Sequence, residues 1–176
     1  MRGVVVYESM FGNTRELAEA IARGMAPGIA AVPVPVSEAT AELLRGIDLL
    51  VVGGPTHAHG MSSAATRVGA PQYVERSHGE LHLEPDVEGP GLRDWFQDMP
   101  EHPVPAAAFD TRADISAMLS GRASKGIASR LKKHGCELVV PPESFLVDKS
   151  HHLLPGELER ALAWGATVAT YVGAQV

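Results

Sequence analysis

Apolar residues in this chain form two kinds of pattern, short continuous runs and longer stretches with helical spacing. Residues 4–7, Val-Val-Val-Tyr, form a run of β-branched and aromatic residues that is typical of a buried strand. The apolar residues that follow recur at intervals of three and four, which predicts an amphipathic helix. They are Leu17, Ala18, Ile21, Ala22 and Met25.

The same two patterns alternate along the rest of the chain. Strands are predicted over residues 29–36, 47–52 and 104–109, with a last strand over 137–140 and 144–147 that Pro141 and Pro142 interrupt. Helices are predicted over residues 38–45, 62–74 with a break at Pro71, 91–99, 124–134 and 157–172. Pro33 and Pro35 cannot donate to a ladder, so the second strand is expected at an edge of the sheet.

This alternation of strands and helices predicts an α/β protein with a parallel sheet and helices on both of its faces. Five strands fit the doubly wound order 2-1-3-4-5, which also places the proline-bearing second strand at an edge. A length of 176 residues fits one domain. We therefore expect a single domain over residues 1–176, with an irregular acidic insertion at about residues 62–103.

Net charge and cysteine content exclude several classes of binding site and partner. The net charge of −6 argues against a nucleic-acid partner. The single cysteine, Cys136, excludes an internal disulfide and a cysteine-based zinc or iron–sulfur site, and is expected to be a buried apolar residue. No basic leader and no run long enough to span a bilayer are present, so a cytoplasmic protein without a membrane partner is predicted.

The turn between the first strand and the first helix has the residues of an anion site. A helix N-terminus offers free N–H groups and the positive end of the helix dipole. Ser9 and Thr14 add hydroxyl groups, Asn13 adds an amide, and Gly12 lets the backbone approach a ligand closely. The alternative is an ordinary turn, because the same residue types are common in turns and helix caps.

Two segments resemble a known family. Ser-x-x-Gly-Asn-Thr (residues 9–14) directly after an apolar strand resembles the FMN-phosphate loop of the flavodoxin family. Its Ser-Met-aromatic-Gly form is similar to that of flavodiiron proteins and flavodoxin-like NAD(P)H:quinone oxidoreductases. Gly-Gly-Pro-Thr-x-x-x-Gly-Met (residues 53–61) resembles the second loop of the same branch. Neither a Rossmann fingerprint nor a P-loop is present.

The resemblance implies the flavodoxin-like fold, with FMN bound by three loops at one edge of the sheet. It implies that the phosphate is held by Ser9, Met10, Phe11, Gly12, Asn13 and Thr14. The flavin ring would lie along Pro55, Thr56, His57, Ala58, His59 and Gly60, and would face Asp110, Thr111 and Arg112 in a loop on its other side. A cation at the pyrimidine end of the ring favours the anionic reduced flavin, and we expect Arg112 to supply it.

The ring loops depart from those of electron-carrier flavodoxins, which commonly hold the ring between aromatic side chains. Residues 56–60 and 110–121 contain no Trp, Tyr or Phe. Without a third clear ligand nearby, His57 and His59 are expected to face solvent or the flavin and not to bind a metal ion. The same expectation holds for the pairs His78/His82 and His151/His152. No metal site is therefore expected.

Three functions follow from these observations. The favoured one is an FMN-binding redox protein that mediates electron transfer. The alternatives are an FMN-dependent NAD(P)H:quinone reductase, and a binding module of the same fold that does not retain FMN. The partner would be a redox protein or a small-molecule quinone, and the acidic insertion is a candidate for docking or for a homo-oligomer contact.

Overall fold

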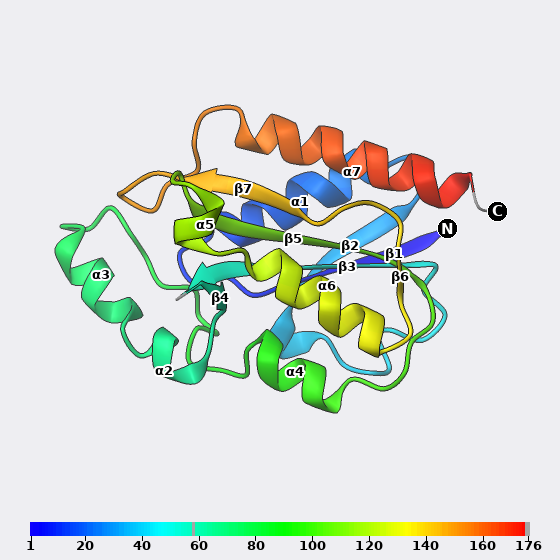
Figure 1. Cartoon of the computed structure of the whole chain (residues 1–176), viewed down its shortest axis with the longest axis horizontal. Helices are drawn as coiled ribbons and strands as arrows, with labels where there is room; N and C mark the ends of the chain where they lie inside the picture. Colours follow the sequence, from blue (N-terminus) through cyan, green and yellow to red (C-terminus); the bar gives the residue numbers. More distant parts are fainter. Residues whose placement is uncertain (58, 175–176) are drawn as a thin grey trace.

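The computed structural model describes residues 1–57 and 59–174, and its centre is a parallel sheet (Figure 1). The sheet runs in the order β2-β1-β3-β5-β6, and β7 also pairs with β5. These strands are β1 (Arg2–Tyr7), β2 (Ala30–Pro35), β3 (Leu49–His57), β5 (Pro105–Ala113), β6 (Glu137–Leu138) and β7 (Glu143–Val147). A short strand β4 (Gly60–Met61) returns antiparallel to β3. If β6 and β7 count as one interrupted strand, the predicted order 2-1-3-4-5 is confirmed.

Prolines explain both edges of the sheet. β2 carries Pro33 and Pro35 and pairs only with β1 among the described strands. At the other edge β6 pairs with the start of β5 and β7 with its end, and Pro141 and Pro142 lie between the two pieces. Because proline has no N–H to donate, it breaks the ladder there.

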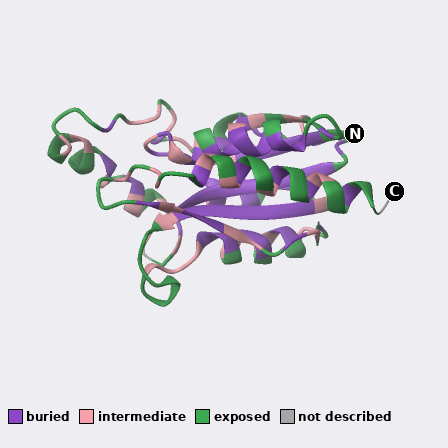
Figure 2. Cartoon of the chain, turned by 90° about the horizontal axis from the view of Figure 1, so that it is seen from above, coloured by how far each residue is buried: buried purple, intermediate pink, exposed green. Residues whose placement is uncertain are grey.

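Helices cover both faces of the sheet. α1 (Asn13–Met25) and α7 (Glu157–Gly173) pack together on one face, and α4 (Leu92–Asp98) and α6 (Ala123–Lys133) lie on the other. The close approach of α1 and α7 requires glycine, because a Cβ on Gly24 or on Gly165 would collide with a backbone carbonyl of the facing helix. The sides of these helices that face away from the sheet carry the exposed residues, while the sheet between them is buried (Figure 2).

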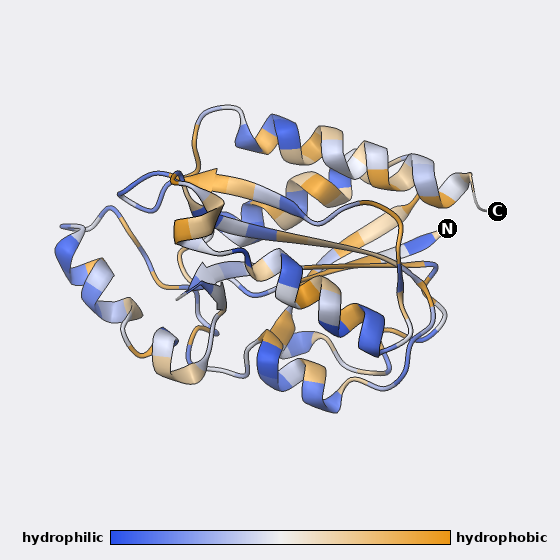
Figure 3. Ribbon diagram, in the orientation of Figure 1, coloured by the Kyte–Doolittle hydropathy of each residue, from blue (hydrophilic) through white to orange (hydrophobic). Residues whose placement is uncertain are grey.

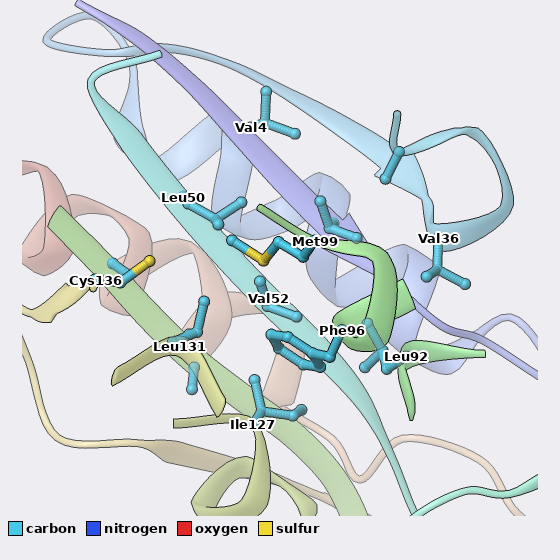
Figure 4. Close-up of a cluster of buried hydrophobic side chains, with 14 of the residues drawn as sticks. Val4, Val36, Leu50, Val52, Leu92, Phe96, Met99, Ile127, Leu131 and Cys136 are labelled. Carbon is cyan, nitrogen blue, oxygen red and sulfur yellow. The ribbon is translucent and has the colours of Figure 1, made fainter. Parts of the chain in front are cut away.

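Alternate side chains of the strands point to opposite faces of the sheet and pack into two apolar clusters. On β1, Val4 and Val6 point to the α4/α6 face and Val5 to the α1/α7 face, and all three are buried. Figure 4 shows the first cluster, in which Phe96 of α4 lies among strand side chains and α6 residues. Figure 3 shows apolar colours along the strands and polar colours on α3. Cys136 is buried in the first cluster, as predicted.

The region between β4 and β5 is mostly irregular. It holds the short helices α2 (Ala64–Arg67) and α3 (Ala70–Arg76), which project beyond the carboxyl ends of the strands (Figure 1), and then α4. A further short helix, α5 (Ala117–Ser120), follows β5. None of the helices in residues 1–57 and 59–174 is both long and apolar enough to cross a membrane.

One predicted helix is wrong. Residues 38–45 form turns after a short 3-10 helix, η1 (Val36–Glu38). Ser37, directly before this segment, donates its hydroxyl to the Asp86 carboxylate at 2.9 Å. Leu44 is buried nevertheless, so the apolar pattern predicted burial correctly while the local backbone took another form.

Candidate functional site

A cavity of about 430 Å³ lies at the carboxyl ends of β1, β3, β5 and β7. This volume falls in the range of about 300–1,000 Å³ that is typical of small-molecule sites. The cavity brings together ten of the residues that sequence reasoning assigned to a ligand: Ser9, Met10, Phe11, Asn13, Thr14, Pro55, Thr56, His57, Thr111 and Arg112. It does not include Gly12, His59, Gly60 or Asp110, and Ala58 lies outside the described residues.

The β1–α1 turn (residues 8–12) presents an open helix N-terminus to this cavity. Gly12 has a left-handed φ of 91°, and its N–H donates to Ser9 Oγ at 3.1 Å. The first helical hydrogen bond runs from Glu16 N to Gly12 O at 2.9 Å, and no side chain of residues 1–57 and 59–174 caps the helix. The N–H groups of the first turn are therefore left without helical acceptors, an arrangement that can accept an anion.

Two residues of the first turn of α1 hold the surrounding segments in place. The hydroxyl of buried Thr14 lies 3.3 Å from that of Thr111, which joins α1 to β5. The Asn13 side-chain amide donates to the carbonyl of His151 at 2.6 Å, which joins α1 to the β7–α7 loop (residues 148–156). The walls of the cavity are thus tied to the first turn of α1.

The third predicted ring loop is a strand in its first part. Asp110, Thr111 and Arg112 belong to β5, because the ladder with β3 continues to Pro55 and Thr111. The Asp110 carboxylate is fully buried and accepts a hydrogen bond from Ser124 N at 2.7 Å, at the start of α6. Asp110 is therefore a cap of α6 and does not face the cavity, which corrects the assignment from sequence.

Thr56 at the end of β3 lines the cavity, whereas His59, just beyond the strand, contacts the end of α5. Thr56 lines the cavity, and its hydroxyl also accepts from Ala123 N at 2.9 Å. His59 is exposed, has a positive φ of 70° and forms a bridge with Gly121. Predicted as a ring contact, His59 instead joins the β3–β4 turn to the end of α5.

Arg112 lines the cavity, but its hydrogen bonds go to the loop that directly follows it. Its Nη1 donates to the carbonyls of Ile115, at 2.7 Å, and Ala113, at 3.2 Å. Its Nε is buried and has no hydrogen-bond partner among the described residues. The guanidinium thus shapes the loop between β5 and α5 while one edge of the side chain borders the cavity.

Comparison with known proteins addresses the fold. No family model and no curated protein matches the sequence. An archaeal flavodoxin structure matches with a TM-score of 0.66 and 19% identity, over 98% of this chain and 99% of that one. A flavodoxin, WrbA-like protein from Agrobacterium tumefaciens gives 0.61 and 20%, over 99% of each chain. The Flv1 flavodiiron core from Synechocystis sp. PCC6803 gives 0.64 and 15%, over 100% of this chain and 37% of that one.

The chain has the flavodoxin-like fold. In open sheets of this kind, ligands bind outside the carboxyl ends of the strands where the strand order reverses, between β1 and β3. The cavity lies at this switch point, because its lining includes the residues that follow β1 and the end of β3.

Aromatic side chains reach the cavity of this flavodoxin-like fold from segments that the sequence did not indicate. Tyr73 of α3 and His151 of the β7–α7 loop line the cavity beside Phe11. The ring of His151 lies 4.9 Å from that of Tyr73 and 5.4 Å from that of Phe11, measured between centroids. Of the two positions expected for His151, solvent-facing or flavin-facing, the structure places its side chain in the lining of the candidate cavity. The remaining lining residues missed by sequence reasoning are Ala113, Val147, Asp148 and Lys149.

Two histidines in the cavity have a pKa below the ordinary value, which favours their neutral forms. Burial lowers the pKa of His57, and the nearby His151 lowers it further. Burial also lowers the pKa of His151, against the opposing effect of the Asp148 carboxylate. Neutral imidazoles can both donate and accept hydrogen bonds, so these side chains offer polar contacts without fixed charge. In residues 1–57 and 59–174, no three His, Cys, Asp or Glu side chains are placed to hold a metal ion.

A buried ionic network joins α2 and α4 to the residue that follows β1. Glu8, directly after β1, accepts hydrogen bonds from Ser62 Oγ and from Leu92 N, the latter at 2.8 Å. Arg67 Nη1 lies 3.2 Å from Ser62 Oγ and 3.8 Å from the Glu8 carboxylate. Its Nη2 donates to Gly89 O at 3.1 Å. The network therefore attaches the inserted segment to the sheet edge that carries the cavity.

Proposed function

We propose that the chain binds FMN in this cavity and acts as a redox protein that transfers electrons. The observation that carries the proposal is the uncapped N-terminus of α1, which opens into a cavity at the β1/β3 switch point. The flavodoxin-like fold supports it. When bound, FMN would supply the transfer of one or two electrons, and the protein would supply binding, orientation and electrostatics.

The β1–α1 turn would hold the phosphate group. Because Ser9 Oγ already accepts the Gly12 N–H, its own hydroxyl proton is left to donate to a phosphate oxygen. Thr14 offers a second buried hydroxyl, and the backbone N–H groups of the first turn of α1 supply the remaining donors. The left-handed conformation of Gly12 leaves the approach to the backbone open.

The remaining walls would position the ring system. Pro55 and Val147 give apolar surface, and Phe11, Tyr73 and His151 give aromatic faces. These aromatic groups come from other segments than the ring loops of electron-carrier flavodoxins. They supply stacking surface that residues 56–60 and 110–121 lack.

A second candidate function is FMN-dependent reduction of a quinone by NAD(P)H. Quinone reduction needs two protons as well as two electrons, and His57 in the cavity is a neutral imidazole that can relay a proton. Tyr73 adds a hydroxyl at the exposed side of the same cavity. Oxidation of NAD(P)H in the presence of a quinone would distinguish this enzyme from an electron carrier.

Titration of flavin fluorescence tests the proposal. FMN should bind more tightly than riboflavin, because only FMN has the phosphate that the β1–α1 turn would hold. Ser9→Ala should weaken FMN binding by roughly ten- to hundredfold, since it removes a hydrogen bond to a charged group. The same substitution should change riboflavin binding little.

Ser129→Ala is the matched control, because Ser129 is an exposed serine of α6 outside the cavity. This variant should bind FMN as the unmodified protein does. Equal affinity for FMN and riboflavin would contradict the role of the turn. If neither flavin binds, the result would favour the last alternative from the sequence, a binding module of this fold that does not retain FMN.

A further inference from the structure

A second cavity, of about 650 Å³, adjoins the first. Phe11 and Asn13 line both cavities, and the hydrogen bond from Asn13 to the His151 carbonyl stands at their border. The walls of the second cavity are the first turn of α1, residues 80–85 of the insertion and the start of α7. The proposed flavin function does not use it.

Five leucine side chains give the second cavity apolar wall surface. Leu81 and Leu83 enter it from the insertion, and Leu153, Leu154 and Leu158 from the segment that leads into α7. Leu81 is buried and the other four are half-buried. An apolar group placed here would remove further leucine surface from water, which is favourable in proportion to the area covered.

The charges on the same walls are mostly negative. Four carboxylates and one guanidinium line the cavity, which gives a net charge of −3 when the histidines are neutral. The guanidinium, on Arg15, is already paired with Glu84 and Glu19, each at 3.1 Å. Glu16, Glu80 and Glu159 form no ion pair with any described residue.

Helix polarity does not cancel this negative charge. The N-termini of α1 and α7 both border the cavity, but Glu16 and Glu159 stand in their first turns. The helix dipole stabilises an ionised carboxylate at such a position, so the positive ends of both helices are already matched by protein anions. A ligand that carries its own anion would therefore meet walls with a net negative charge.

We propose that the second cavity binds an organic cation, in which an ammonium group is carried on an apolar body. The leucines would cover the apolar body, and Glu16, Glu80 and Glu159 would surround the ammonium group. The volume suits a small molecule, because it lies within the range of about 300–1,000 Å³ found for such sites. This site is independent of the proposed flavin function.

Three probes of similar shape and different charge test the inference on the full-length protein without flavin. Isothermal titration with phenylbutylamine, phenylbutanol and phenylbutyrate should give the tightest binding for the amine, weaker binding for the alcohol and the weakest for the carboxylate. The double variant Glu16→Gln/Glu159→Gln should weaken binding of the amine by about fivefold or more and leave that of the alcohol unchanged. Leu83→Asn should weaken both.

Glu137→Gln is the matched control, since Glu137 is exposed at the amino edge of the sheet. It removes one negative charge and should leave amine binding unchanged. The proposal is overturned if the three probes bind equally, if none binds, or if Glu137→Gln weakens the amine as much as the double variant does. Flavin titration of the same samples reports separately on the first cavity.

Discussion

Removal of the Arg67 guanidinium should destabilise the protein strongly. In Arg67→Met, the apolar stem keeps its volume, but the Glu8 carboxylate loses the cation 3.8 Å away. Both side chains are buried, with 6% of Glu8 and 7% of Arg67 exposed. The carboxylate would then have to stay charged in a poorly solvated place or take up a proton, and either outcome costs free energy.

The size of the effect follows from what remains around Glu8. Loss of one partner of a buried ion pair costs about 3–5 kcal/mol. Leu92 N and Ser62 Oγ would still donate to the carboxylate, so we expect about 3 kcal/mol, at the low end of that range. Glu8→Gln removes the charge and keeps an acceptor for Leu92 N, and it should cost less than Arg67→Met.

A double-mutant cycle in urea measures the pair directly. Glu8→Gln/Arg67→Met should lose at least about 1 kcal/mol less than the sum of the single variants, because the second change removes the charge that the first left unpaired. Glu19→Gln, which breaks an exposed ion pair with Arg15, is the control and should change the free energy of unfolding by no more than about 1 kcal/mol. Additive single effects, or a loss below about 1 kcal/mol in Arg67→Met, would refute the reasoning.

Three further predictions concern packing, pH and the cavity. Gly165→Ala should lower the free energy of unfolding by about 1–3 kcal/mol in urea, since its Cβ meets the backbone of α1, whereas Gly173→Ala should not, because nothing lies near it. Burial lowers the pKa of His57, so the unfolded state binds more protons than the folded state below the unfolded pKa of about 6.5. The free energy of unfolding should therefore fall as pH falls through about 6.5, and His57→Gln should reduce this slope in urea titrations at several pH values. Arg112→Ala should lower the reduction potential of bound flavin in a redox titration; an unchanged potential would contradict its role as a cation at the ring.

Much of the fold could be predicted because its signals are local. The apolar runs and the helical spacing each lie within a few residues, and the prolines of β2 fix its place at an edge. The helix predicted over residues 38–45 is replaced by turns, and Ser37, directly before it, bonds to Asp86, far along the chain. A long-range partner of that kind leaves no mark in the local pattern.

The candidate site was predictable only where it rests on continuous segments. The β1–α1 turn and the end of β3 each carry their residues in one stretch, and most of these line the cavity. Asp110 was misplaced because its orientation depends on Ser124 at the start of α6. Tyr73 and His151 were missed because α3 and the β7–α7 loop are far along the chain from Phe11, and only the folded chain brings them together.

The ionic network and the cavity should be coupled through the insertion. Arg67 ends α2, and α3, which follows directly, carries Tyr73 to the cavity. A ligand that contacts Tyr73 in the folded state alone would stabilise that state by mass action. Saturating FMN should therefore raise the urea midpoint of the unmodified protein, and raise it less in Arg67→Met if loss of the network displaces α3. An equal shift in both proteins would show that the position of Tyr73 does not depend on the Glu8–Arg67 pair.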